Sequence, residues 1–279
     1  VIPRKEKGTT MEVHIPMKKA VVDAFPDTLQ QKSVLAVNKK YKILVVDDDA
    51  VFLSIVREML LTLEQEVDIC NTLADFEQFL PNISQYDMII TDRYMGAFSG
   101  IDTLQKVRHL DQSIPVCLMS GHSGFDDQKA LSEGFDVFLL KPFTIQHLAD
   151  LLNGISSPQR KRELSQEQDD YMLFLEEIFK GDQEIIHHIL NSLVQSLCNN
   201  IILLREAIID DNFSVAQSVC HKTLGTFSQL NITSGAEILK KMDASRGEEY
   251  KNWKDDVRKL LELMEALAEE ITNRYLECE

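Results

Sequence analysis

The stretch YDMIITD, from Tyr86 to Asp92, decides the fold of this chain, because it is a buried-strand pattern that ends on a carboxylate. Three other apolar runs, over residues 43–46, 116–119 and 137–140, also end at polar side chains. These are Asp47-Asp48, Ser120 and Lys141, which is followed by Pro142. In a parallel sheet, strand ends of one polarity meet along one edge, where open α/β folds bind ligands. We therefore expect three carboxylates, a hydroxyl and an ammonium to converge there.

The segment that contains these runs alternates between strand and helix patterns. β-rich runs near 42–46, 66–70, 86–91, 115–119 and 136–140 are separated by helix-length segments that include 51–63, 101–110 and 145–152. Five strands in this alternation predict a doubly wound parallel sheet. Asp49 is interpreted as a helix cap for the run that begins at Ala50.

The residues at the strand ends indicate a phosphoryl site. Asp47, Asp48 and Asp92 crowd negative charge that is costly unless a cation shares the site, and an all-oxygen pocket suits Mg²⁺. Lys141 would offset charge on a phosphoryl group at Asp92, and the Ser120 hydroxyl could donate to it. The expected product is an aspartyl phosphate on Asp92.

These residues make the segment from Tyr41 to Ser156 resemble the receiver domain of two-component response regulators, which implies a flavodoxin-like fold with a five-stranded parallel sheet. The resemblance implies that Asp92 is the phosphoacceptor. It implies that Mg²⁺ is bound by Asp47, Asp48, Asp92 and the backbone carbonyl of Tyr94, that Ser120 and Lys141 contact the phosphoryl group, and that Ser120 and Phe138 form a switch at successive strand ends. The family usually has Met-Pro after the acceptor, where this chain has RYMGAFSG over residues 93–100, and we expect Gly96 to loosen that loop.

Each of these residues also has a simpler interpretation. A single Asp after a strand is more often a helix cap or a turn former, Ser120 alone is a turn residue, and Lys141-Pro142 alone is a strand terminator. Phe138 would by default be a core residue. Four such signals in the family's order favour the functional interpretation.

A second domain is expected over residues 169–279, after a polar linker at 157–168. Apolar residues recur at three- and four-residue steps over 186–208 and 253–271, and Tyr171 to Phe179 predicts a shorter helix that ends at Gly181. Ser234 with Glu237 is a capping-box pattern for a further helix. Together with 212–230, these segments predict an all-α antiparallel bundle of four principal helices.

The segment 212–230 contains a second candidate site. Its apolar residues cluster on one arc of a helix, and His221 points away from them, flanked by small residues. A glycine inside a helix costs about 1 kcal/mol against alanine, so Gly225, one turn after His221, indicates that a partner docks closely there.

With these features, residues 167–279 resemble the histidine-containing phosphotransfer (HPt) domain, which implies that His221 carries a phosphoryl group and that Gly225 lies at the docking surface. The family commonly has a lysine three residues after the histidine, where this chain has Leu224. Lys222 lies on the opposite flank of His221, so we expect little electrostatic help from it. The alternative is that His221 is an ordinary surface histidine.

Composition limits the class of protein. The net charge of −16 leaves no basic stripe for nucleic acid, so we expect no nucleic-acid partner. No apolar run reaches ~18 residues, and no leader pattern is present, so we expect no membrane insertion and no secretion. The five cysteines, at 70, 117, 198, 220 and 278, have no metal spacing and are expected to be reduced core thiols of a cytoplasmic protein. Residues 1–40 form a basic extension with 8 Lys and Arg against 4 Asp and Glu, in which 18–25 could form a short helix.

Together these features indicate a cytoplasmic phosphorelay protein of two-component signal transduction. We see no ATP-binding kinase pattern, so it is expected to be a phosphotransfer protein rather than an enzyme with a kinase domain, and to receive phosphate from a histidine kinase or exchange it with other receiver or HPt proteins. One alternative is an adapter whose bundle binds a kinase or receiver without phosphotransfer, and another is a fragment of a larger hybrid kinase. Residues 41–156 carry −11 and residues 157–279 carry −9, so we expect the domains to repel unless the basic extension bridges them. An encounter of His221 with Asp92 of the same chain is within reach of the linker, but we expect His221 to prefer a partner's receiver.

Overall fold

The computed structural model describes residues 2–3, 9–10, 37, 39–96, 98–121, 127–154, 171–245 and 250–276. The predicted linker at 157–168, the predicted helix at 18–25 and Cys278 lie outside the described residues. Within the N-terminal extension, β1 (Ile2–Pro3) pairs with β2 (Thr9–Thr10) in antiparallel orientation. This extension and the rest of the chain form separate compact units.

The predicted five-stranded parallel sheet is confirmed. It consists of β3 (Lys42–Val46), β4 (Glu66–Cys70), β5 (Met88–Asp92), β8 (Val116–Ser120) and β9 (Val137–Leu140), in the spatial order β4-β3-β5-β8-β9. The strand order reverses between β3 and β5. This flavodoxin-like order opens a crevice at the carboxyl ends of those two strands, where Asp47 and Asp92 lie.

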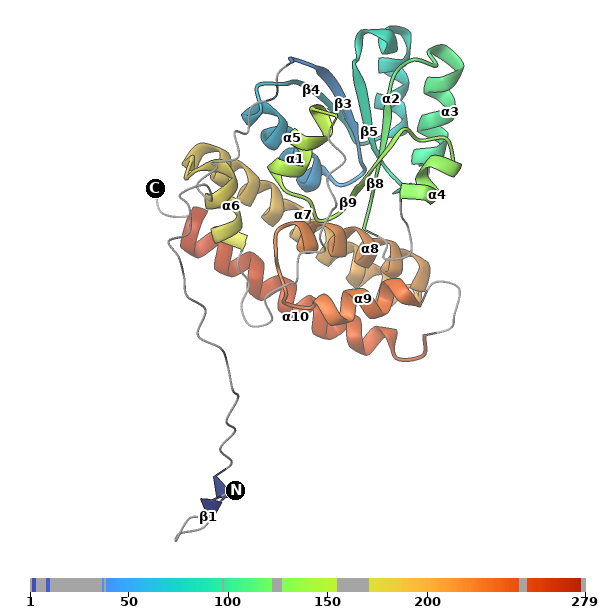
Figure 1. Ribbon diagram of the computed structural model, residues 1–279. Coiled ribbons are helices and arrows are strands. Elements are labelled where there is room, and N and C mark those ends of the chain that lie inside the picture. The colour runs from blue at the N-terminus through green and yellow to red at the C-terminus, as the bar shows by residue number, and fades with distance from the viewer. Residues whose placement is uncertain are drawn as a thin grey trace, which may run out of the picture. The chain divides into compact units, whose positions relative to one another are not determined.

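Helices cover both faces of the sheet (Figure 1). They are α1 (Ala50–Thr62), α2 (Leu73–Phe79), which continues into η2 (Leu80–Gln85), α3 (Gly100–Leu110), α4 (Asp127–Ser132) and α5 (Ile145–Leu152). Residues of α1 and α5 pack on one face with Ile43 and Val45, and residues of α2, α3 and α4 pack on the other with Leu44 and Val46. The alternation along β3 therefore supplies both cores. Asp49 caps α1 as predicted, because its carboxylate accepts from the Val51 and Phe52 N–H groups at 2.9 and 3.1 Å.

The loop after Asp92 differs from the expectation that Gly96 loosens it. Strand β6 (Tyr94–Met95) pairs with β7 (Phe98–Ser99) in a short antiparallel hairpin. Gly96 opens its turn with a φ of +61°, a conformation that glycine adopts at little cost. The glycine therefore closes a hairpin instead of loosening a loop.

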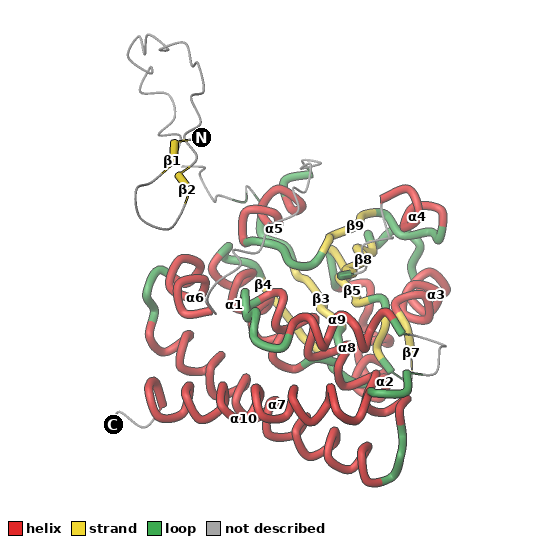
Figure 2. Tube along the Cα trace, turned by 90° about the horizontal axis from the view of Figure 1, so that it is seen from below, coloured by secondary structure: helices red, strands yellow, loops and turns green. Residues whose placement is uncertain are grey.

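The C-terminal part of the chain is helical, and we call it the helical region. It comprises α6 (Tyr171–Phe179), α7 (Gln183–Ile209), α8 (Phe213–Gln229), α9 (Ala236–Ala244), α10 (Trp253–Ile271) and η3 (Thr272–Leu276). Helix α7 packs against α8 and α10, and α9 packs against α8 (Figure 2). The capping box predicted at Ser234 is wrong. Helix α9 begins after Gly235, whose φ of +77° sets the turn, and no side chain caps it.

Helix α7 has the length and apolar composition of a membrane-crossing helix, with a mean hydropathy of 1.2 over its most apolar window, and it was the one such helix found among the described residues. In this structure its apolar residues serve a protein core. Ile186, Ile189, Leu190, Leu193, Leu197, Ile201, Leu204 and Ala207 are all buried. Their spacing is that of a helix packed on one side by its neighbours.

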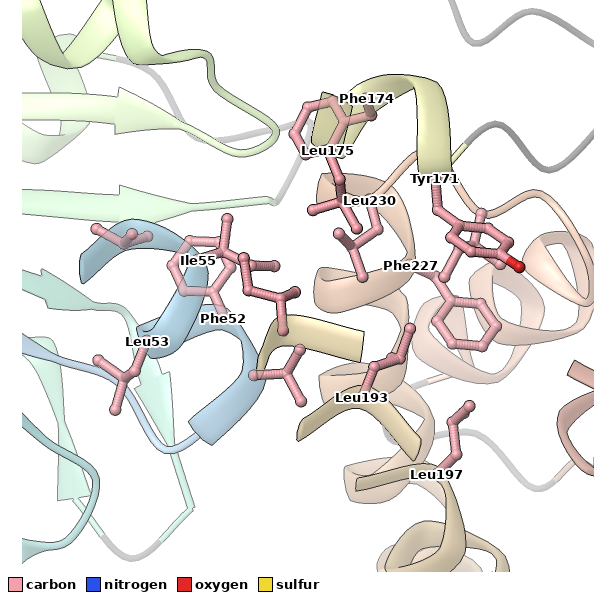
Figure 3. Packing of buried hydrophobic residues seen from close by; sticks show 14 of the residues in the cluster. Phe52, Leu53, Ile55, Tyr171, Phe174, Leu175, Leu193, Leu197, Phe227 and Leu230 are labelled. Atoms are coloured by element: carbon pink, nitrogen blue, oxygen red, sulfur yellow. The ribbon is translucent and has the colours of Figure 1, made fainter. Parts of the chain in front are cut away.

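The sheet domain and the helical region share one apolar core. Phe52 and Ile55 of α1 belong to the same buried cluster as Leu175, Leu193 and Leu230 of the helical region (Figure 3). The expectation that the two parts repel is therefore wrong for this structure. Net charge acts weakly over distance in salt, whereas close apolar packing and local ion pairs act at contact.

The cysteines agree with the prediction at three of the four described positions. Cys70, Cys117 and Cys220 are buried free thiols, whereas Cys198 is free and exposed. Its assignment to the core is wrong because its position on α7 lies outside the buried stripe of that helix.

Candidate functional site

The carboxylates predicted at the strand ends meet at the crevice between β3 and β5. Lys141, which follows β9, places its Nζ 2.6 Å from Asp47 Oδ2 and 2.7 Å from Asp92 Oδ1. The Lys141 side chain is only 9% exposed, and its ammonium lies 3.7 Å from the centre of the Phe52 ring. One buried ammonium therefore pairs with two carboxylates that come from different strands.

Burial dominates the electrostatics of this cluster. Desolvation raises the pKa of Asp47, although the Lys141 ammonium opposes the rise. Desolvation also raises the pKa of Asp48, against the effect of Lys222. Burial alone would lower the pKa of Lys141, but Asp47 and Asp92 outweigh it and raise that pKa. The site thus holds more negative charge than its own lysine compensates.

The donor set suits a hard cation, because Asp47, Asp48 and Asp92 offer only oxygen. The three carboxylates are, however, engaged by ammonium groups, with Asp48 Oδ2 at 2.6 Å from Lys222 Nζ. Within the described ranges, no three His, Cys, Asp or Glu side chains are already gathered to bind an ion. A divalent cation fits the chemistry of the site and would have to displace an ammonium from it. Near Asp92, the backbone N–H of Tyr94 donates to Asp92 Oδ2 at 2.8 Å.

Ser120 and Phe138 lie close to their predicted positions, with one correction. Ser120 is the last residue of β8, is 3% exposed and is in register with Leu140. Phe138 pairs with Leu118, two residues before the end of β9, so it does not lie at a strand end as expected. Because side chains alternate along a strand, Phe138 and Ser120 still point to the same face of the sheet.

Gly100 is a site residue that was not predicted from the sequence. A Cβ at this position would lie 2.5 Å from the backbone oxygen of Asp92. The Gly100 N–H also donates to the Arg93 carbonyl at 3.1 Å. Any larger residue at the start of α3 would push against the backbone of the acceptor. The sequence hint was a glycine placed directly before an apolar helix, which is a weak signal.

His221 lies beside this acidic edge. Its ring is 5.9 Å from the ring of Tyr94, centre to centre, at an interplanar angle of 80°. One residue further along α8, Lys222 forms the ion pair with Asp48, and one turn later the Thr226 hydroxyl donates to the Asp49 carboxylate. From the sequence, we expected Lys222 to give little electrostatic help to His221. In this structure the Lys222 ammonium instead pairs with Asp48, a carboxylate of the sheet domain.

A carboxylate of the helical region holds the other side of the His221 ring. Nδ1 of His221 lies 2.7 Å from Oδ1 of Asp243, on α9. The His221 side chain is 29% exposed, so it is less open than predicted, because Tyr94 and Asp243 flank it. Leu224 is partly buried against the shared core, and a Cβ at Gly225 would have nothing within 4 Å. The space above Gly225 is thus free within the described part of this chain.

Thr226 and Gln229, the polar residues that join the two parts, were not predicted from the sequence, and neither was Asp243. Gln229 is fully buried, and its side chain bonds the backbone of Phe143. A polar residue between Phe227 and Leu230 on an apolar arc was the available signal for it. Asp243 and Thr226 gave no comparable signal, because both are ordinary helix-surface types whose partners are distant in sequence.

With this geometry established, comparison with known proteins identifies the sheet domain. Residues 43–153 match the family described as the response regulator receiver domain. This segment is therefore a receiver domain of the two-component type, a module that is phosphorylated on an aspartate. This match ends at residue 153, before the helical region begins.

Individual relatives align over the same part of the chain. The transcriptional regulatory protein PrrA of Mycobacterium leprae is 33% identical over 124 residues, which are 43% of this chain and 51% of that protein. The two-component response regulator PhoP of Pseudomonas aeruginosa is 28% identical and is covered to 51%, along 41% of this chain. The chain spans about half the length of these curated relatives.

Solved structures align over the receiver domain as well. A receiver domain protein from Clostridium thermocellum is 30% identical, with a TM-score of 0.39, over 41% of this chain and 92% of that one. The receiver domain of the sensor histidine kinase PA1611 from Pseudomonas aeruginosa, with magnesium in its active-site cleft, is 23% identical, with a TM-score of 0.36, over 42% and 97% of the two chains.

Proposed function

We propose that this protein is a phosphorelay component in which Asp92 accepts a phosphoryl group with the help of Mg²⁺ and His221 exchanges that group with Asp92 of the same chain. One observation carries the proposal. The His221 ring packs on Tyr94, whose N–H bonds Asp92, while the neighbouring Lys222 is paired with Asp48. The histidine and the acidic site therefore belong to one continuous set of contacts.

At the receiver site, an oxygen of Asp92 attacks the phosphorus of a donor, and the donor's bond to that phosphorus breaks as the aspartyl phosphate forms. Asp47, Asp48, Asp92 and the Tyr94 carbonyl would hold Mg²⁺, which supplies positive charge opposite the phosphoryl oxygens. The ammonium of Lys141, whose Nζ lies 2.7 Å from Asp92 Oδ1, would contact the same oxygens. The hydroxyl of Ser120, the last residue of the neighbouring strand β8, would donate to one of them.

At the histidine, the reactive atom is Nε2, because Nδ1 is bonded to Asp243. Transfer from Asp92 breaks the acyl–phosphate bond and forms an N–P bond, and the reverse step regenerates the aspartyl phosphate. Holding His221 against the receiver in the same chain removes the entropic cost of bringing the two groups together. We therefore replace the trans preference that net charge suggested with a preference for exchange within one chain.

The remaining features of the proposal concern partners and setting. A separate histidine kinase, or another receiver or HPt protein, would supply or take the phosphoryl group. The protein would work in the cytoplasm, without direct contact to nucleic acid or insertion into a membrane, and without an ATP-binding kinase domain of its own. The strongly acidic composition supports the exclusion of nucleic acid.

One observation favours the adapter as a second candidate. Leu224, which stands where the HPt family commonly has a lysine, is packed against the shared core and adds no charge near His221. In that case the helical region would bind a kinase or a receiver without carrying phosphate. The two candidates differ in whether His221 is ever phosphorylated.

Labelling with radioactive acetyl phosphate tests both steps. Wild type, Asp92→Asn and His221→Gln are labelled with Mg²⁺ and, separately, with excess chelator. We expect chelator-sensitive labelling of wild type and His221→Gln, and none of Asp92→Asn. Alkali-stable label, the signature of phosphohistidine, should appear in wild type alone. Its absence there, with labelling of Asp92 intact, would leave the adapter as the function.

A further inference from the structure

Lys222 and Asp48 form an ion pair between the helical region and the receiver domain. Lys222 Nζ lies 2.6 Å from Asp48 Oδ2, and the two side chains are 36% and 12% exposed. The Asp48 carboxylate is thus mostly shielded from water, and its counter-ion comes from α8 rather than from the receiver. The Thr226 hydroxyl adds a second bond from α8, to the Asp49 carboxylate next in sequence.

The charges of the acidic site make the contact between Lys222 and Asp48 sensitive to a bound divalent cation. Lys141 is shared between Asp47 and Asp92, so in this structure Asp48 takes its positive charge from Lys222. A divalent cation bound by Asp48 would stand within a few ångströms of the Lys222 ammonium, where like charges repel strongly because water is largely excluded. The cation and the Lys222 ammonium therefore compete for the Asp48 carboxylate.

We infer that Lys222 is the built-in counter-ion of the receiver's acidic site, and that docking of α8 and binding of a divalent cation compete for Asp48. The inference rests on the proposed cation site at Asp47, Asp48 and Asp92. The cation releases Lys222 from Asp48 and loosens this part of α8, which opens the edge at Asp92 to a phosphodonor, while the shared apolar core keeps the helical region on the receiver. Without the cation, α8 covers that edge and protects it. The helical region thus regulates access to the acceptor as well as exchanging phosphate with it.

Calorimetric titration of the full chain with MgCl₂ tests the inference without any phosphotransfer. Lys222→Met removes the ammonium and keeps the apolar stem, so it should bind Mg²⁺ about three- to tenfold more tightly than wild type. Lys222→Arg keeps the charge and should stay near wild type. Lys240→Met makes the same change at an exposed lysine of α9 and should have no effect.

A second readout follows docking directly. Saturating Mg²⁺ should raise hydrogen exchange of the amides in 222–229 of α8 in wild type, and Asp48→Asn should abolish that response. Equal Mg²⁺ affinity in wild type and Lys222→Met, with both folded by circular dichroism, would overturn the competition. Absence of Mg²⁺ binding in all variants would instead remove the proposed cation site itself.

The bond between His221 and Asp243 carries a second, independent inference. An ionised carboxylate can only accept a hydrogen bond, so Nδ1 of His221 carries the proton at a distance of 2.7 Å from Asp243 Oδ1. That tautomer leaves a lone pair on Nε2, the other ring nitrogen. We propose that Asp243 is a positioning residue, which fixes the tautomer and the ring orientation of His221 for attack by Nε2. This role depends on the proposed phosphorylation of His221.

Nitrogen-15 spectra of the histidine rings test the tautomer, with His221→Gln identifying the His221 signals. Wild type should show Nδ1 protonated, and Asp243→Ala should shift His221 toward the Nε2-protonated form. Phosphohistidine formation should fall tenfold or more in Asp243→Ala. Asp255→Asn alters an exposed carboxylate of α10 and should change neither quantity. An unchanged tautomer in Asp243→Ala refutes the positioning role, whereas wild type without any phosphohistidine refutes the proposed transfer.

Discussion

The side-chain amide of Gln229 makes two hydrogen bonds with the backbone of Phe143. Its Oε1 accepts from the Phe143 N–H at 3.1 Å, and its Nε2 donates to the Phe143 carbonyl at 2.8 Å. Gln229 ends α8 and is fully buried, and Phe143 follows Lys141 by two residues. The helix that carries His221 is thereby joined to the loop that carries the lysine of the acidic site.

Loss of this joint should uncouple the two parts of the chain. Gln229→Ala leaves a buried N–H and a buried carbonyl without their partner, at a cost of about 2 kcal/mol or more. We expect wild type to unfold in urea with coincident transitions by circular dichroism and by fluorescence of Trp253, the one tryptophan of the chain. In Gln229→Ala the two transitions should separate.

Gln217→Ala is the matched control for this change. Gln217 donates to the Met242 carbonyl at 3.0 Å within the helical region, so its loss should lower stability without separating the two probes. If both variants leave the probes coincident, the Gln229 bonds do not couple the domains.

Removal of Lys141 should be costly in a way that depends on metal. Lys141→Met leaves Asp47 and Asp92 facing each other in a buried site, and we expect the free energy of unfolding in chelator to fall by about 3 kcal/mol. Millimolar Mg²⁺ should restore part of this loss by replacing the missing charge. Lys106→Met, at an exposed pair with Glu77, should cost less than about 1 kcal/mol with or without Mg²⁺. Urea titrations under both conditions measure the difference.

The sequence predicted most of what depends on local pattern, although the capping box at Ser234 and the loosened loop at Gly96 were wrong. The four strand ends, the cap at Asp49 and the helix from Tyr171 to Phe179 follow from residue order alone. The contacts of Lys222, Gln229 and Asp243 do not, because each depends on which helix faces pack together, and many packings satisfy the same apolar stripes. The net charges of the two parts led to a wrong prediction of their arrangement, because a net charge sums over residues that are not in contact with one another.

His147 should make the stability of the receiver fall in mild acid. Burial lowers the pKa of His147 below 6.5, although Asp150 opposes the shift, and Nδ1 of His147 accepts from the Thr144 N–H at 3.1 Å in the cap of α5. A histidine that is kept neutral by folding contributes stability that is fully present above pH 6.5 and is lost as pH falls through the lower folded pKa.

The matched variant His147→Gln can accept the same bond without titrating. Urea titrations at pH 7.5 and at pH 5 should therefore show a smaller loss of stability in His147→Gln than in wild type. Equal losses would mean that the cap keeps its strength when His147 is protonated.

A substitution at Gly225 should distinguish phosphoryl exchange within one chain from phosphoryl exchange between two chains. A Cβ there meets nothing within 4 Å, so Gly225→Ala should raise stability by about 1 kcal/mol and leave the docked arrangement intact. Gly235→Ala, whose Cβ would lie 2.7 Å from Leu260 Cδ1, should instead lower stability, which confirms that the substitution reports on local space. If the free space serves another molecule's receiver, only exchange between chains should suffer in Gly225→Ala.

Mixed full-length chains measure that difference. A chain with His221→Gln, labelled on Asp92, can pass its phosphate only to His221 of a second chain that carries Asp92→Asn. Exchange within one chain is followed in wild type as appearance of alkali-stable label. We expect it to be independent of protein concentration and unchanged by Gly225→Ala, because a Cβ at Gly225 meets nothing within 4 Å in the docked arrangement. Transfer in the mixed pair should be slower and should fall further when the acceptor chain carries Gly225→Ala. Rapid transfer in the mixed pair, with none inside wild-type chains, would show that the docked arrangement holds His221 away from Asp92 rather than presenting it.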